Sequence, residues 1–140
     1  MAFRHTLTVR FFEIDRAGIV FFGRFFEYCH AAFEELQHAA FGDPERAFTE
    51  ATYAFPLVHA EADFKAPARL GEALTIEVSL AAKGERSLSF AYRILGPAGE
   101  GDLRATCLLR HAFVDRSTFR SMAVPVEFVA AIERSIAGEG

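Results

Sequence analysis

An acidic residue inside a glycine-containing turn is the first feature of this sequence that could perform chemistry. Residues 12–23 read FEIDRAGIVFFG, so Asp15 and Gly18 lie just before a long apolar segment with helical spacing. The first N–H groups of a helix have no intrahelical partner and carry the positive end of the helix dipole, so they can polarise an acyl oxygen. A nearby carboxylate can attack the acyl carbon or deprotonate a water molecule. The segment therefore predicts carbonyl chemistry, with Asp15 as nucleophile or general base.

Asp15 also has an ordinary structural interpretation, because aspartate is common in turns and at helix N-termini. Against a capping role, Asp15 lies about five to seven residues before the expected helix, which is too far for an ordinary cap. Its sequence neighbours are mostly apolar, and an unpaired charge in apolar surroundings costs desolvation free energy. We therefore expect apolar side chains to wall in the Asp15 carboxylate.

The elements that must position this turn follow from the spacing of apolar residues. Residues 3–11 alternate in the period of a half-buried strand. From Phe22 onward, apolar residues recur at three- and four-residue steps, which predicts a helix to about Phe41, ended by the Gly42-Asp43-Pro44 sequence. Asp15 is thus expected between a strand and the N-terminus of a long helix.

Further strands are predicted downstream. After a short segment that could be helical over residues 45–50, residues 53–65 form one extended strand, and three more strands follow, at residues 74–80, 87–94 and 103–114. Glycine-rich turns join these last strands, so neighbours should be antiparallel, and Pro125 opens a short helix to about residue 136. This pattern indicates the α+β class, with a curved antiparallel sheet wrapped around one long central helix. Because such a sheet leaves an edge strand exposed, we expect a homodimer.

Composition excludes several classes of protein. The chain has 140 residues, 51% of them hydrophobic and 24% charged, as expected for a single globular domain over residues 1–140. A net charge of −4 provides no positive field for a phosphate backbone, so nucleic acid is not an expected partner. No uncharged apolar stretch approaches the roughly 18 residues of a membrane span, and no signal peptide is visible, so a cytoplasmic location is expected.

The cysteines, histidines and phenylalanines each add one expectation. Cys29 and Cys107 lie far apart without metal-ligand spacing, which favours buried thiols in a reducing compartment. The histidines show no paired spacing either, so no metal is expected. Phenylalanine is in excess: eight of the 16 lie between Phe11 and Phe41, more than one monomer's core should require.

The motif at residues 15–22, DRAGIVFF, followed by an aromatic-rich helix, resembles the signature of the hotdog-fold acyl-CoA thioesterases of the 4-hydroxybenzoyl-CoA thioesterase family, which include the thioesterases associated with the Tol-Pal system. Residues 64–74, FKAPARLGEAL, resemble the family's Pro-x-Arg-x-Gly-Asp-x-Leu segment, and Arg86-Ser87 resembles the opening of its next strand. The resemblance covers nearly the whole chain. It implies a hotdog fold, a homodimer or dimer of dimers (a homotetramer), and hydrolysis of an acyl-CoA to a carboxylic acid and coenzyme A.

The resemblance also implies roles for single residues. Asp15 matches the catalytic aspartate, and the backbone N–H of Phe22 matches the donor to the thioester oxygen. From their place beside Asp15 and at the start of the helix, rather than from the resemblance, Gly18, Phe21 and Phe25 are expected to contact substrate. Arg86 and Ser87 match the place where a neighbouring subunit meets the nucleotide part of coenzyme A, so the active site would lie at the dimer interface. The acyl-CoA is then the substrate, and no separate cofactor is required.

Departures from the family pattern limit this transfer. Arg16 stands where the aromatic-CoA member has proline, and Phe21-Phe22 stand where it has Trp-Tyr, so 4-hydroxybenzoyl specificity does not follow.

Another branch of the fold carries its carboxylate on the central helix, which makes Glu27 or Glu34 a rival to Asp15. A non-catalytic acyl-CoA-binding or regulatory module is the alternative function. A hotdog dehydratase is disfavoured, because that chemistry typically pairs histidine with an acidic residue and the Asp15 motif has no histidine.

Overall fold

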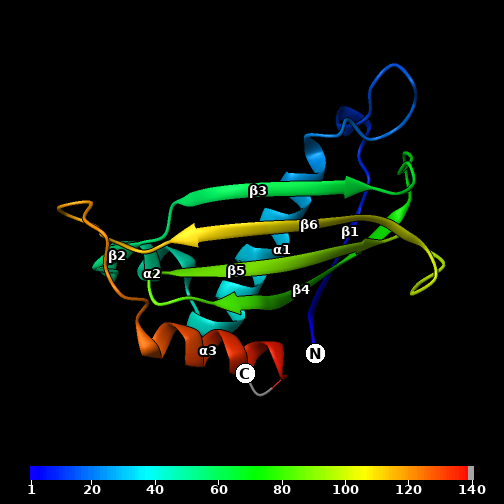
Figure 1. The fold of residues 1–140 in the computed structure, drawn as a ribbon. Coiled ribbons are helices and arrows are strands. Elements are labelled where there is room, and N and C mark those ends of the chain that lie inside the picture. Colours follow the sequence, from blue (N-terminus) through cyan, green and yellow to red (C-terminus); the bar gives the residue numbers. More distant parts are fainter. Residues whose placement is uncertain (139–140) are drawn as a thin grey trace.

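The computed structural model describes residues 1–138, and a five-stranded antiparallel sheet curves around the long helix α1 (Figure 1). Across the sheet the strands are β1 (Phe3–Thr8), β4 (Ala73–Lys83), β5 (Ser87–Leu95), β6 (Leu103–Ala112) and β3 (Leu57–Phe64). A second, two-stranded sheet pairs β2 (Tyr53–Ala54) with β7 (Val114–Asp115). The helices are α1 (Arg24–Phe41), α2 (Pro44–Glu50) and α3 (Val126–Ile136). The predicted α+β class and the antiparallel order of β4, β5 and β6 are confirmed.

The core lies between the concave face of the sheet and the apolar face of α1. Alternate residues of β4 and β5 point into it, and α1 contributes a stripe at helical spacing: Phe25, Tyr28, Cys29, Ala32, Phe33 and Leu36. Burying a large apolar side chain contributes about 1.5–3 kcal/mol, so this stripe fixes the helix on the sheet. Cys29 and Cys107 are both buried free thiols, as the sequence predicted. Within residues 1–138, no helix is long and apolar enough to cross a membrane.

The first strand and the long helix are both shorter than the sequence predicted. The expected strand over residues 3–11 ends at Thr8, because residues 11–13 form a single 3-10 turn in which the Glu13 carboxylate accepts the Arg10 N–H at 2.7 Å. The helix begins at Arg24 rather than Phe22, because the Phe21 N–H donates to the Glu13 carbonyl and holds the chain in a turn.

The expected single strand over residues 53–65 is also wrong. Pro56 lacks an N–H, so it cannot continue a paired strand, and the chain divides there into β2 and β3. The two pieces pair with different partners, β2 with β7 and β3 with β6. Residues 103–114 divide in the same way, into β6 and β7.

Strand β3 forms an open edge of the sheet. It pairs with β6 on one side, and on the other it has no strand partner within residues 1–138. Its apolar side chains are exposed, including Leu57 (51%), Val58 (58%) and Phe64 (48%). Unpaired strand edges with apolar side chains are surfaces on which another chain can pair.

A charged cluster centred on Arg104 of β6 fixes the turn that joins β3 to β4. The guanidinium binds both oxygens of the Glu72 carboxylate, at 2.7 and 2.8 Å, and also donates to Asp102 at 2.8 Å. It further donates to the Pro67 carbonyl at 2.8 Å, so it holds both ends of the 67–72 turn. Arg104 lowers the pKa of both the Glu72 and Asp102 carboxyls. Paired, bidentate contacts of this kind are the strongest polar interactions in proteins.

Replacing Arg104 with methionine removes the cation and leaves Glu72 without its partner. We expect the free energy of unfolding at pH 7 to fall by about 2–3 kcal/mol, measured by urea denaturation. Arg110→Met is the matched control, because Arg110 is exposed on the same strand and has no recorded ion pair within residues 1–138. Equal losses in the two variants would contradict a structural role for Arg104.

The same cluster sets the response of the fold to acid. Arg104 lowers these pKa values only in the folded state, so the unfolded chain binds the protons at a higher pH. Stability is therefore complete above the unfolded pKa values of about 4 and falls as the pH drops below them. Between pH 5 and 3, the free energy of unfolding should therefore fall by less in Arg104→Met than in the wild type, measured by urea denaturation at each pH. The difference between the two proteins should scale with the pKa shifts that Arg104 causes.

Candidate functional site

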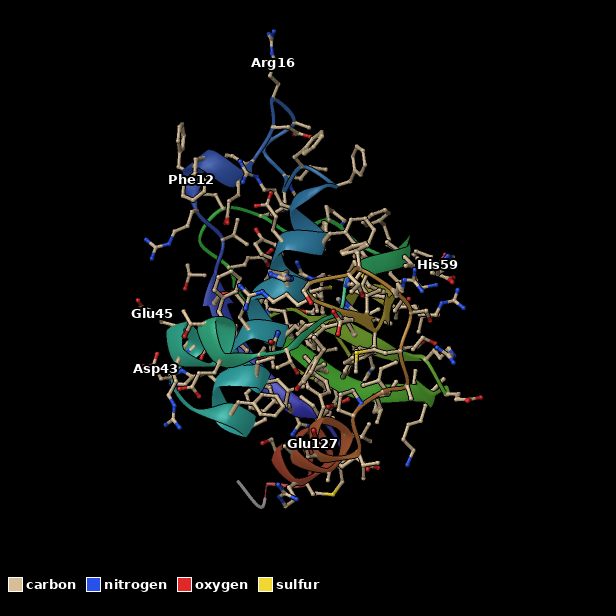
Figure 2. The ribbon with its side chains drawn as sticks, turned by 90° about the vertical axis from the view of Figure 1, so that its left-hand side faces the viewer. Phe12, Arg16, Asp43, Glu45, His59 and Glu127 are labelled. Carbon is tan, nitrogen blue, oxygen red and sulfur yellow. The ribbon has the colours of Figure 1, made fainter. Side chains whose placement is uncertain are left out.

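The loop that carries Asp15 is a narrow, hairpin-like excursion between the 3-10 turn and α1. Ile14 and Val20 face each other across it as an isolated bridge, and the Asp15 N–H donates to the Ile19 carbonyl at 2.8 Å. Gly18 closes the turn with a φ of +79°, and its N–H donates to the Asp15 carbonyl at 3.0 Å. Figure 2 shows Arg16 projecting from the tip of this loop, away from the body of the protein.

The base of the loop is anchored to the segment that Arg104 holds. The Val20 N–H donates to the Ala68 carbonyl at 2.8 Å, and Ile19 forms an isolated bridge with Arg69. On the other side, the Tyr28 hydroxyl of α1 donates to the Glu13 carboxylate at 3.0 Å. The pKa of Tyr28 is raised, chiefly because its hydroxyl is partly buried and also because Glu13 is close. The loop is thus connected to both the sheet and the helix.

The Asp15 side chain is exposed in the single protomer. One carboxylate oxygen, Oδ1, accepts the Ala17 N–H at 2.8 Å, the usual arrangement of an aspartate turn. The other oxygen, Oδ2, has no recorded hydrogen-bond partner among residues 1–138 and is available to react. The expectation that apolar side chains wall in this carboxylate is wrong for one protomer, because the loop projects away from the core.

The backbone N–H of Phe22 lies in the turn before α1, not in the helix itself. Neither it nor the Gly23 N–H donates to a recorded acceptor within residues 1–138. The Phe22 ring packs in a tilted arrangement against the Phe21 ring, with the centroids 4.7 Å apart, and both rings are exposed. Phe64 of β3, which the sequence analysis did not single out, packs edge-on against Phe22 at 6.3 Å and against the buried Phe25 at 5.3 Å.

A hollow of about 340 Å³ lies beside these rings. Two predicted residues, Phe22 and Phe25, line it, together with Ile19, Val20, Phe64, Lys65, Ala66 and Pro67. Gly18 and Phe21 do not line it, although Phe21 stacks on a residue that does. The hollow provides an apolar surface beside free backbone N–H groups, with a carboxylate on the adjoining loop. These are the components that addition to an acyl carbonyl requires.

Arg86 and Ser87 lie at the opposite end of the sheet. Ser87 pairs with Ala112 at the far end of β6, whereas Phe64 pairs with Ala105 near its beginning. The Arg86 guanidinium donates to the Ser121 hydroxyl at 3.2 Å, and its backbone carbonyl accepts the Phe113 N–H. One protomer therefore does not bring these two residues together with Asp15.

A cavity of about 920 Å³ lies at that opposite end, between the C-terminal half of α1, α2, β2 and the loop after β7. Its aromatic lining comes from segments far apart in the sequence: Phe41, Phe48, Tyr53, Phe55, Phe119 and Phe128. No periodicity along the chain signals such a cavity, and the sequence analysis missed it. The only sign available was the excess of phenylalanine.

The rival carboxylates on α1 are engaged elsewhere. Glu27 pairs with Arg24 at 2.8 Å on the exposed side of the first turn. Glu34 pairs with His30 at 3.2 Å and lines the 920 Å³ cavity. Within the described residues, no three His, Cys, Asp or Glu side chains are grouped to hold a metal ion.

Known proteins resemble this chain along most of its length. The family model of the thioesterase-like superfamily matches residues 9–132. A 1,4-dihydroxy-2-naphthoyl-CoA hydrolase from Nostoc punctiforme is 32% identical, over 95% of this chain and 88% of its own length. The crystal structure of a 1,4-dihydroxy-2-naphthoyl-CoA thioesterase from Synechocystis aligns with a TM-score of 0.83 and 26% identity, over 94% of this chain and 96% of that one. A 4-hydroxybenzoyl-CoA thioesterase, with a TM-score of 0.82 and 19% identity over 94% and 98% of the two chains, shares the fold.

Gly18 offers a direct test of the loop geometry. An added Cβ at Gly18 would meet no atom within 4 Å, so Gly18→Ala costs only the penalty of its left-handed backbone. We expect the free energy of unfolding to fall by about 1 kcal/mol, measured by urea denaturation. Gly101→Ala is the matched control, because its site is equally open and its φ is not left-handed. A Gly18→Ala protein as stable as the control would mean that the loop does not adopt this turn.

Proposed function

The chain belongs to the thioesterase-like superfamily, and from that premise we propose that it hydrolyses an aromatic acyl-CoA, with 1,4-dihydroxy-2-naphthoyl-CoA as the preferred substrate. The products are the aromatic carboxylic acid and free coenzyme A. The choice of substrate rests on the relative from Nostoc punctiforme, which is named for this reaction and matches this chain over 88% of its own length. The exposed Asp15 carboxylate and the unpaired backbone N–H groups before α1 support the choice of chemistry.

In the proposed mechanism, the Phe22 N–H donates a hydrogen bond to the thioester oxygen. Asp15 Oδ2 either attacks the carbonyl carbon or takes a proton from a water molecule that attacks it. On the first route, the C–S bond breaks to leave an anhydride with Asp15, which water then hydrolyses; on the second, the C–S bond breaks directly to give the acid. In both, coenzyme A leaves as a thiolate, which departs from a tetrahedral intermediate without a strong general acid. Water is the only co-substrate.

A homodimer formed through the β3 edges would complete this site. A two-fold axis that pairs the two edges in antiparallel fashion places Phe64 of one protomer beside the partner's Leu57. The loop before α1 rises past β3 at one end of the sheet, while α2 and β2 lie at the other end (Figure 1). Pairing therefore brings each Asp15 loop to the partner's Arg86–Ser87 end, where the partner can contact the nucleotide part of the substrate. We further propose that two such dimers associate, as the family resemblance implies.

Asp15→Asn tests the proposed chemistry. Asparagine keeps an oxygen for the Ala17 N–H but is neither a nucleophile nor a base, so the fold should be unchanged. We expect kcat for release of free thiol from 1,4-dihydroxy-2-naphthoyl-CoA to fall by about a hundredfold or more. Glu27→Gln is the control, because it neutralises the nearest rival carboxylate on α1. Turnover by Asp15→Asn close to that of Glu27→Gln would reject Asp15 as the reacting group.

Val58→Glu tests the proposed dimer. Val58 is an exposed residue of the open strand edge, and in the proposed pairing it lies opposite the partner's Asp63, so a glutamate there would place like charges opposite each other on both sides of the two-fold axis. We expect analytical ultracentrifugation to show the mass of a monomer, or a dimer with a dissociation constant at least about tenfold weaker. Thiol release should fall in parallel, because each site draws on both protomers. An active monomer would contradict the shared site.

A further inference from the structure

The 920 Å³ cavity has the size and lining of a site for a flat aromatic group. Ligand pockets span about 300–1,000 Å³ and are mostly apolar with a few placed polar groups. Here the interior is formed by rings such as Tyr53, Phe55 and Phe128, and Arg116 stands at the rim. None of the residues in the proposed mechanism lines this cavity.

Phe119, at the rim, is held in a strained backbone conformation. Its φ is +60°, and it is the only non-glycine residue with a positive φ among residues 1–138. The loop enforces this: the Asp115 carboxylate accepts the N–H groups of Ser117 and Thr118, both at 2.9 Å, and the Phe119 N–H donates to the Asp115 carbonyl at 2.7 Å. The ring is 67% exposed and stacks on no other ring in the described part of the chain. Strained residues of this kind persist where the surrounding structure holds them in place, and they cluster at active sites and ligand clamps.

Arg116 joins the rim to α2. Its guanidinium lies over the Phe48 ring, 4.6 Å from the centroid, and its Nη1 donates to the carbonyls of Phe48 and Ala51. Its Nε and Nη2 have no recorded acceptor within residues 1–138. The rim thus combines two exposed rings, Phe48 and Phe119, with a fixed cation that has free donors. This combination suits a flat aromatic group that carries oxygen substituents.

The cavity lies far from the Asp15 loop of its own chain. Helix α1, with 18 residues, is about 27 Å long, and the Asp15 loop lies beyond its N-terminus while the cavity adjoins its C-terminal half. Figure 2 shows Arg16 of the loop at one extreme of the molecule and Asp43 and Glu45, at the start of α2, well away from it. Antiparallel pairing of the β3 edges would instead bring the partner's Asp15 loop to this end.

We propose that this cavity receives the acyl group of the substrate whose thioester lies at the partner's Asp15, and that Phe48, Arg116 and Phe119 determine specificity for an oxygenated aromatic ring. The inference rests on the proposed thioesterase function and adds the residues that select the acyl group.

Ala47→Trp in α2 fills the cavity, because Ala47 lines it. We expect kcat/KM for 1,4-dihydroxy-2-naphthoyl-CoA to fall at least about tenfold. Ala39→Trp, at an exposed position of α1 that lines neither cavity, is the matched control and should keep wild-type kinetics. Equal kinetics in the two variants would overturn the proposal.

Heterodimers then decide whether the cavity acts on the partner's site. Chains carrying Asp15→Asn and Ala47→Trp, each with its own affinity tag, are co-expressed and purified through both tags. If the cavity serves the partner, each heterodimer has one site with both Asp15 and an open cavity, so it should recover about half of the wild-type activity per dimer. If the cavity serves its own chain, both sites remain defective.

These outcomes separate the inference from the proposed function. An active Asp15→Asn homodimer would reject the function. An inactive Asp15→Asn homodimer, together with heterodimers that show native circular dichroism but no recovered activity, would reject only the placement of the cavity. Failure of the tagged chains to purify together would also reject it.

A second variant tests Phe119 without filling the cavity. Phe119→Gly relieves the positive φ and removes the ring, so it should raise the unfolding midpoint while raising KM for 1,4-dihydroxy-2-naphthoyl-CoA. A more stable variant with unchanged KM would show that the ring does not contact the acyl group.

Discussion

The contact between Arg104 and Glu72 is the constraint on which the candidate site depends. Its two hydrogen bonds join the sheet to the turn before β4, and a third bond from Arg104 holds the Pro67 carbonyl. The neighbouring Ala68 carbonyl then accepts the Val20 N–H, which fixes one side of the Asp15 loop. The Asp15 loop is thus positioned from the sheet, through backbone contacts, and not by packing around the Asp15 side chain. This explains how an exposed loop can have a definite geometry.

Pairing of two protomers through the open edge of β3 would bring opposite ends of the two protomers together. One end carries a carboxylate and free N–H groups beside a small hollow, and the other carries a large aromatic cavity with Arg86 nearby. In the proposed function, the acyl group, the thioester and the nucleotide part of coenzyme A are divided between these two ends. In the proposed dimer, the Asp15 end of each protomer lies against the cavity end of its partner. The phenylalanine excess is then divided among the core, the subunit interface and the acyl pocket.

Features that depend on neighbours in the sequence could be predicted. The Asp15 turn, the apolar face of α1 and the alternation in β4 and β5 follow from local spacing, and the resemblance of the DRAGIVFF motif identified the family that the comparisons confirm. Features set by distant contacts could not. The exposure of Asp15 depends on where the loop projects, and the division at Pro56 depends on the separate partners of β2 and β3. The left-handed backbone of Phe119 results from the Asp115 turn, which no residue preference signals for phenylalanine.

Chromatographic analysis of the wild-type protein incubated with excess 1,4-dihydroxy-2-naphthoyl-CoA shows whether the protein hydrolyses this thioester. We expect free coenzyme A and the carboxylic acid to appear in equal amounts, in many-fold molar excess over the protein. Recovery of the intact thioester bound to the protein, with no free coenzyme A, would contradict this expectation and would instead identify a non-catalytic acyl-CoA-binding module.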